Sequence, residues 1–323
     1  MATFALVWAL ALALASRPEA DQSASAPRMA EHRYRIEGKV RLLLFWATGD
    51  EVGGARVTWR DTGADAHAFS LLIGTNPQRA PRGINEWGYF HESVDGNQAR
   101  VLGVRTVTDP ASPEAARTQA AVTDDRAVFA MICSDIAAHE ARSSIATFRA
   151  PRDVSYDRFD RLLDAIGNNP SSESRQVARP DAAAPGFLTA LDRAMRASGE
   201  MARAGRPPSA IKPVAYVYKD AVFDLSIRRA EPLPQLQSGT EVHRNLVRAD
   251  FRVRNRRTNE PTDFTMTFGV DGELAAVPIQ AAYQPNWWLK IQLVLSDRFD
   301  VPADPRSDDL LRQRMDSLCA QTH

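Results

Sequence analysis

Residues 264–295 of this 323-residue chain read FTMTFGVDGELAAVPIQAAYQPNWWLKIQLVL, and their pattern predicts the fold. Apolar side chains occupy every second position over 264–270, which is the period of a β-strand with one buried face. Asp271 and Gly272 follow, and this pair favours a tight hairpin turn. The alternation resumes over 275–283 and again over 287–295. We therefore expect a three-stranded antiparallel meander with one apolar face.

The same two-residue period recurs along most of the chain, in short runs separated by Gly, Asp, Asn or Pro. Residues 127–133 are apolar on both faces, which predicts a strand in the middle of the sheet. The glycines between 49 and 54 and the proline-rich segment 231–240 are expected to connect strands. The other expected strands cover 33–46, 55–60, 69–73, 101–104, 144–148, 214–218, 223–227 and 243–253.

Between residues 151 and 213 the apolar period lengthens to nearly four, which predicts amphipathic helices. One helix is expected over 156–166 and a second from Phe187, joined by a polar, mobile linker over 171–185. Ser112 and Ser307 are expected to cap a short helix over 112–122 and a C-terminal helix. The expected apolar faces are Leu188, Leu191 and Met195 in the second helix, and Leu310, Leu311, Met315 and Leu318 in the last one.

These patterns predict an α+β fold, in which two or three helices cover a large curved antiparallel sheet that is open or closed in part into a barrel. Residues 1–26 are expected to be a signal peptide and short polar leader, and 27–152 an N-terminal antiparallel β region. A helical insert with a mobile linker would span 153–206, and a C-terminal meander with a terminal helix would span 207–323. The two β regions are expected to form one continuous domain.

The N-terminus has the features of a secretory signal. Residues 4–15 are apolar, and small residues allow cleavage after Ala15 or Ala26. As a helix, this run would reach about 18 Å, against a bilayer hydrocarbon core of roughly 30 Å. We therefore expect no transmembrane span and export to the periplasm or the cell exterior.

The charge balance indicates no polyanionic partner. The chain has 40 basic and 40 acidic residues, so its formal net charge at pH 7 is zero. No overall field would attract nucleic acid, and we expect none as a partner.

Two cysteines, Cys133 and Cys319, leave two alternatives open. In an oxidising compartment they could pair, and closing so long a loop would stabilise the fold by about 4–5 kcal/mol. The alternative, which we favour from the sequence, is that Cys133 serves as a small unpaired core residue in its apolar strand.

The segment 74–92 is the best candidate for a ligand-binding loop, because functional residues concentrate on loops. Arg79 and Arg82 could present guanidinium groups to an anion, and Trp87 and Tyr89 could flank it. Trp288 is a further candidate, since Trp287 and Trp288 are adjacent on a strand and one of them should face away from the core. The alternative for 74–92 is a surface crossover held by its aromatic residues.

No catalytic motif is recognisable in the sequence. There is no Gly-x-Ser-x-Gly elbow and no phosphate-binding glycine loop, and the His-Glu pairs lack the spacing of a zinc protease. His91 and Glu92 are adjacent on an expected strand, so their side chains should point to opposite faces. A composite site made of His67, His91, Asp135 and His139 is the remaining enzymatic possibility. We predict no cofactor and no metal.

The leading hypothesis is an exported, non-catalytic binding or carrier protein. Its curved sheet and helices would form a groove for a lipid or another apolar or amphipathic ligand, or a docking face for an envelope protein. The number of tryptophans on expected strands motivates this hypothesis, because tryptophan is a frequent contact residue. The alternatives are a hydrolase or metal-dependent enzyme that uses His91, Asp135 and His139, and a purely structural surface protein.

Overall fold

The computed structural model describes residues 29–42, 45–61, 66–80, 85–106, 126–154, 171–207, 210–238, 240–286, 289–296 and 305–322. These residues form one antiparallel sheet and two α-helices, α4 (Phe187–Arg203) and α5 (Pro305–Thr322), with a short 3-10 turn η5 (Gly272–Leu274). The strands are β1 (Met29–Leu42), β2 (Phe45–Asp61), β3 (Ala66–Thr75), β4 (Trp87–Asp95), β5 (Gln98–Thr106), β6 (Arg126–Ile136), β7 (Glu140–Pro151), β8 (Ser171–Ala178), β9 (Val214–Tyr218), β10 (Ala221–Ser238), β11 (Glu241–Asn255), β12 (Pro261–Gly269), β13 (Pro278–Asn286) and β14 (Leu289–Leu295).

The first strand lies in the middle of the sheet. The 14 strands are ordered β8-β7-β6-β5-β4-β3-β2-β1-β14-β13-β12-β11-β10-β9, so β1 joins the N-terminal strands to the C-terminal meander. Tyr34 of β1 lies opposite Ala55 of β2 on one side and Leu295 of β14 on the other. Each strand therefore pairs with its neighbours in sequence, except at β1, β14 and the two edges β8 and β9.

The sheet curls until its two ends meet. The hydroxyl of Ser143 in β7 donates a hydrogen bond of 2.6 Å to the carbonyl oxygen of Lys219, in the turn between β9 and β10. Arg175 of β8 forms an ion pair of 2.7 Å with Asp220 of the same turn. The antiparallel curved sheet of the sequence prediction is thereby confirmed.

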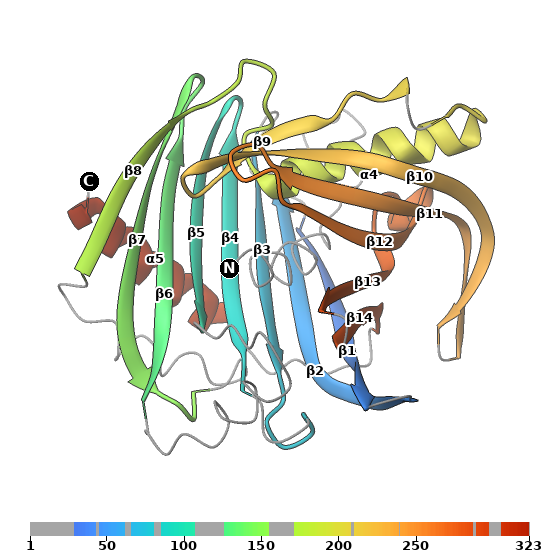
Figure 1. Ribbon diagram of the computed structural model, residues 1–323, viewed down its shortest axis with the longest axis horizontal. Coiled ribbons are helices and arrows are strands. Elements are labelled where there is room, and N and C mark those ends of the chain that lie inside the picture. The colour runs from blue at the N-terminus through green and yellow to red at the C-terminus, as the bar shows by residue number, and fades with distance from the viewer. Residues whose placement is uncertain are drawn as a thin grey trace.

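Each face of the sheet packs against one helix. The inner face and α4 share a core that contains Phe90, Val101 and Phe251, together with the predicted apolar residues of α4. The outer face packs against α5, where Met315 and Cys319 are buried beside Leu102. In Figure 1, α4 runs along β9 and β10, whereas α5 crosses the sheet on the far side of β5 to β7. α4 is thus packed against the concave face of the sheet.

The C-terminal meander is confirmed, but its first turn is not the predicted tight hairpin. Phe264 pairs with Tyr283, and Tyr283 pairs with Ile291, as the alternation requires. The connection between β12 and β13 instead contains η5 and folds back on the end of β12, where the amide of Gly269 donates to Val277. A Cβ at Gly269 would lie 2.2 Å from the carbonyl oxygen of Leu274, so this close approach requires glycine.

The glycines between 49 and 54 lie inside a strand and do not end one, which corrects the sequence prediction. The expected strand over 33–46 is divided between β1 and β2, and β2 runs through all these glycines. A Cβ at Gly53 would lie 2.1 Å from the carbonyl oxygen of Gly74, so glycine here lets the backbones of β2 and β3 approach closely.

Two expected connections are also strands. The proline-rich segment 231–240 falls largely within β10, whose pairing with β9 ends at Leu225. Pro232 lies beyond that point, where β10 pairs with β11 alone and is an edge strand, the position in a sheet that tolerates proline. The expected mobile linker 171–185 begins with β8, an edge strand that pairs with β7 over all eight of its residues. The helices expected over 112–122 and 156–166 lie outside the described residues.

The C-terminal helix begins at Pro305, so Ser307 is not its N-cap as predicted. Met315 is fully buried, as expected, but Leu310 is 55% exposed because the buried stripe follows Met315 and Cys319. The side chains of Leu311 and Leu318 lie outside the described set.

No helix among the residues with assigned structure is long and apolar enough to cross a membrane.

Candidate functional site

A cavity of about 800 Å³ lies on the outer face of the sheet, at the end where β2 ends, β3 begins, and the β4–β5 and β6–β7 turns lie. Side chains from β1 to β7 form its floor, and Asp309 and Arg312 of α5 form one wall. The floor combines apolar side chains such as Met29 and Tyr89 with the hydroxyl groups of Ser70 and Ser93. This volume and this mixture of surfaces are typical of small-molecule sites.

Five arginines from four elements line the cavity, together with five carboxylates, so the formal charge of the lining is balanced.

Several of these carboxylates form ion pairs with arginines. Arg100 Nε lies 3.3 Å from Asp135 and 3.3 Å from Asp316. Glu31 pairs with Arg33 at 2.9 Å. The lining arginines are Arg56, Arg60, Arg100, Arg142 and Arg312, and the lining carboxylates are Glu31, Asp95, Asp135, Glu140 and Asp309.

His91 of β4 is the buried titratable group on the cavity floor. Its side chain is 4% exposed, and its Nδ1 lies 2.8 Å from the hydroxyl oxygen of Ser70 in β3. Burial, and to a smaller extent the positive charges of Arg312 and Arg60, together lower the pKa of His91 to about 3. His91 is therefore neutral at physiological pH and can act as a hydrogen-bonding group without a charge.

The low pKa of His91 predicts a loss of stability in acid. The unfolded residue takes up a proton near pH 6.5 and the folded residue only near pH 3, so the unfolded state binds more protons between these values. Stability from this group is complete above pH 6.5 and falls as the pH decreases. At about pH 4.5, two units lower, the loss should be about 2.7 kcal/mol at 1.36 kcal/mol per unit.

Urea unfolding of the wild type and of His91→Asn at about pH 7.5 and about pH 4.5 measures this loss. Asparagine keeps a polar group near the Nδ1 position for Ser70 but does not titrate. We expect the decrease in unfolding free energy to be smaller by about 2–3 kcal/mol in the variant. An equal decrease in both proteins would show that His91 does not carry this pH dependence.

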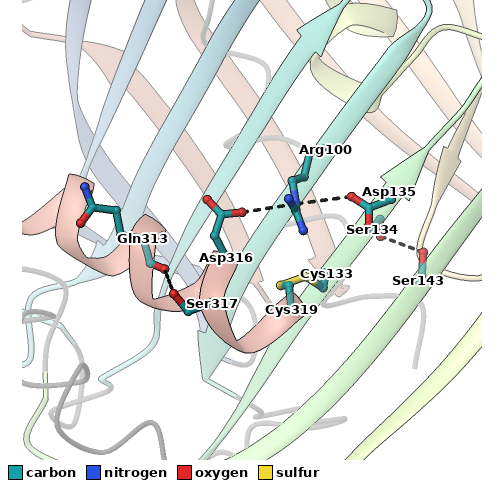
Figure 2. The surroundings of a disulfide bond; sticks show 9 residues. All are labelled: Arg100, Cys133, Ser134, Asp135, Ser143, Gln313, Asp316, Ser317 and Cys319. Atoms are coloured by element: carbon teal, nitrogen blue, oxygen red, sulfur yellow. Dashed lines mark hydrogen bonds and ion pairs between the residues drawn. A yellow bond between two sulfur atoms is a disulfide. The ribbon is translucent and has the colours of Figure 1, made fainter. Parts of the chain in front are cut away.

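A disulfide bond fixes α5 against the floor of the cavity, which corrects our preference for an unpaired Cys133. Cys133 of β6 is bonded to Cys319 of α5, with Cα atoms 5.9 Å apart and a sequence separation of 186 residues. Figure 2 shows this bond beside Arg100, which lies between Asp135 on the sheet and Asp316 on the helix. The bond and the ion pairs together hold Arg312 and Asp309 at the cavity wall.

The inner face of β4 is anchored to α4 through Glu92. Its fully buried carboxylate accepts hydrogen bonds from the amides of Leu188 (3.0 Å) and Thr189 (3.1 Å) and from the hydroxyl of Thr189 (2.8 Å). Burial raises the pKa of Glu92, and these hydrogen bonds and the charge of Arg193 oppose the rise. His91 and Glu92 thus lie on opposite faces, as predicted, and Glu92 anchors the strand that carries His91.

The described residues of the predicted binding loop have different surroundings. Arg79 is exposed and pairs with Glu51, while the ring of Trp87 is 2% exposed and donates a 2.7 Å hydrogen bond from Nε1 to the carbonyl oxygen of Val154. Tyr89 is also buried, but it lines the cavity. Arg82 and Trp288 lie outside the described residues, so a role for them and for Arg79 in ligand binding stays a prediction.

The alternative site is only partly assembled. His67, His91 and Asp135 all line the cavity, but His139 lies in the β6–β7 turn with its side chain 83% exposed, 3.5 Å from Asp181. Within the ranges given for the fold, no group of three or more His, Cys, Asp or Glu side chains could hold a metal ion. His67 contacts Thr189 instead, at 3.2 Å.

Sequence reasoning missed the arginines of the cavity. The alternation placed Arg56, Thr58 and Arg60 on one face of a strand, which was a usable signal that this face is polar. It contained no signal that α5 docks on the same face, because Arg312 lies 252 residues beyond Arg60 and helix docking depends on tertiary packing.

The sequence matches no family model and no curated protein. Two solved structures show distant similarity. One is a β-barrel-like protein of domain of unknown function DUF1849 from Brucella abortus, with 9% identity and a TM-score of 0.31 over 85% of this chain and 100% of that one. The other, from Parabacteroides distasonis, is described as "a putative lipoprotein", with 8% identity and a TM-score of 0.25 over 82% and 94% of the two chains. At these TM-scores neither likeness supports a statement about function.

Proposed function

We propose that this chain is a non-catalytic binding protein that holds an amphipathic ligand in the outer-face cavity between α5 and the sheet. The observation that carries this proposal is the cavity of about 800 Å³ with both polar and apolar walls. On the concave side of the sheet, where we first expected a groove, α4 packs against the apolar core. The outer face is therefore the better position for a ligand.

The walls of the cavity are held in place before any ligand binds. The disulfide ties α5 to β6, and the Glu92 carboxylate ties β4 to α4. A preformed site loses little conformational entropy on binding, which favours affinity. The disulfide also supports export, because such bonds persist in oxidising compartments such as the periplasm and the cell exterior.

Binding of an uncharged apolar probe tests this function. Ala68 lies on the cavity floor, opposite Arg60 on one side and Ser93 on the other, so Ala68→Trp should fill the space. We expect N-phenyl-1-naphthylamine to increase its fluorescence on binding to the wild type, and Ala68→Trp to weaken this binding at least tenfold.

Ala138→Trp is the matched control, because Ala138 is exposed in the β6–β7 turn and does not line the cavity. It should bind the probe as the wild type does. The proposal is wrong if the wild type does not bind the probe, or if both tryptophan variants bind it equally well.

A further inference from the structure

The cationic groups around His91 come from two different elements. Arg60 lies on β2, Arg312 lies on α5, and both charges act on the His91 imidazole of β4. Both guanidinium groups line the cavity close enough to act on His91, so they make the potential at this part of the floor more positive. The formal charges of the lining residues sum to zero, but positive charge is concentrated beside His91.

The nearby carboxylates leave this excess in place. Asp309 pairs with Arg312 at 3.0 Å on the surface of α5, where the two side chains are 50% and 29% exposed, and such pairs are weak. Asp135 and Asp316 are both held by Arg100. Among the residues with described positions, no carboxylate lies within ion-pair distance of Arg60.

Neutral hydrogen-bonding groups accompany the two guanidinium groups. When the Ser70 hydroxyl donates to Nδ1 of His91, the proton of the neutral imidazole lies on Nε2, which can donate to a ligand. Hydrogen bonds from guanidinium groups to phosphate or carboxylate are stronger than those between neutral groups. Two guanidinium groups can therefore bind one such anion together.

We propose that the ligand of this cavity carries an anionic group, a phosphate or a carboxylate, which binds between Arg60 and Arg312 beside His91. This inference rests on the binding function proposed above and specifies the class of ligand. The apolar part of the ligand lies along the side chains that surround the mouth, including Met29, which is 53% exposed.

Displacement of N-phenyl-1-naphthylamine from the full chain tests the inference. Decyl phosphate and 1-decanol have the same alkyl chain and differ in the head group. We expect decyl phosphate to displace the probe from the wild type at a concentration at least tenfold lower than 1-decanol. Arg60→Gln and Arg312→Gln should each reduce this preference about tenfold, measured as the ratio of the displacing concentrations of decyl phosphate and 1-decanol on the same variant.

Arg254→Gln is the matched control, because Arg254 is exposed on β11 and lies outside the cavity lining. It should keep the full preference for decyl phosphate. Titration calorimetry with inorganic phosphate distinguishes a free anion from a lipid head group. If the wild type binds phosphate and Arg60→Gln does not, free phosphate is a ligand of the proposed anion site. If the wild type does not bind phosphate, the anionic group binds only when it is attached to an alkyl chain.

Equal displacement by decyl phosphate and 1-decanol in the wild type, without phosphate binding, would overturn the inference and leave the proposed function intact. The inference would also be overturned, with the proposed function intact, if Arg254→Gln lowers the preference for decyl phosphate as much as Arg60→Gln does. Failure of the probe to bind the wild type would instead remove the proposed function itself.

Discussion

Replacing Glu92 with alanine is expected to lower the free energy of unfolding by about 3–5 kcal/mol, because three buried donors lose their acceptor. The first turn of α4 has no acidic residue, and its N-cap, Gly186, makes no side-chain hydrogen bond. The Glu92 carboxylate supplies this cap from another element. Its removal leaves two amides and the Thr189 hydroxyl without this acceptor in a buried position.

A double-mutant cycle with Gly186 isolates this interaction. Gly186 has an extended conformation (φ −157°) that alanine adopts without strain, but a Cβ there would lie 2.3 Å from the carboxyl carbon of Glu92. Gly186→Ala should therefore destabilise the wild type by about 2–3 kcal/mol through overpacking. In the Glu92→Ala background the same change should cost less than about 0.5 kcal/mol, because the obstructing group is gone. Urea unfolding measures all four proteins, and additive effects would show that Glu92 does not occupy this position.

Loss of the Cys133–Cys319 disulfide is expected to destabilise the protein by about 3–5 kcal/mol, since the bond closes a very long loop in the unfolded chain. Because both cysteines are buried, the suitable variant is Cys133→Ala with Cys319→Ala, which adds no polar group to the core. Probe binding should also weaken, because α5 forms one wall of the cavity.

Ser317→Ala is the control for the helix itself, as it removes only an exposed hydrogen bond to the carbonyl oxygen of Gln313 on the same face of α5. It should change the unfolding free energy by less than about 0.5 kcal/mol. Comparing the wild type before and after reduction measures the disulfide without any substitution. Two free thiols in the protein as purified, or equal stability after reduction, would contradict the prediction.

Alternation predicted most strands, because a strand with one buried face has a period of two in any tertiary context. It predicted the faces as well, placing Phe264 and Met266 in the core and His91 opposite Glu92. It misassigned the glycines of β2, because the same residue serves in turns and where two backbones approach closely, as Gly53 approaches Gly74. The structure alone distinguishes these uses.

The candidate site was less predictable than the fold. Tyr89 and the pair His91 and Asp135 were singled out for other reasons, and they line the cavity. The rest depends on the docking of α5 on the outer face, which joins segments far apart in the sequence. A pattern with a period of two or four specifies which face of an element is apolar, but not which element covers it.

A crystal structure of the full chain grown with decyl phosphate would test whether the outer-face cavity is the ligand site. We expect the phosphate group within hydrogen-bond distance of Arg60 and Arg312, beside His91, with the alkyl chain along the cavity walls and α4 unmoved. A decyl phosphate molecule bound on the concave side of the sheet in place of α4, with the outer cavity holding only solvent, would contradict it.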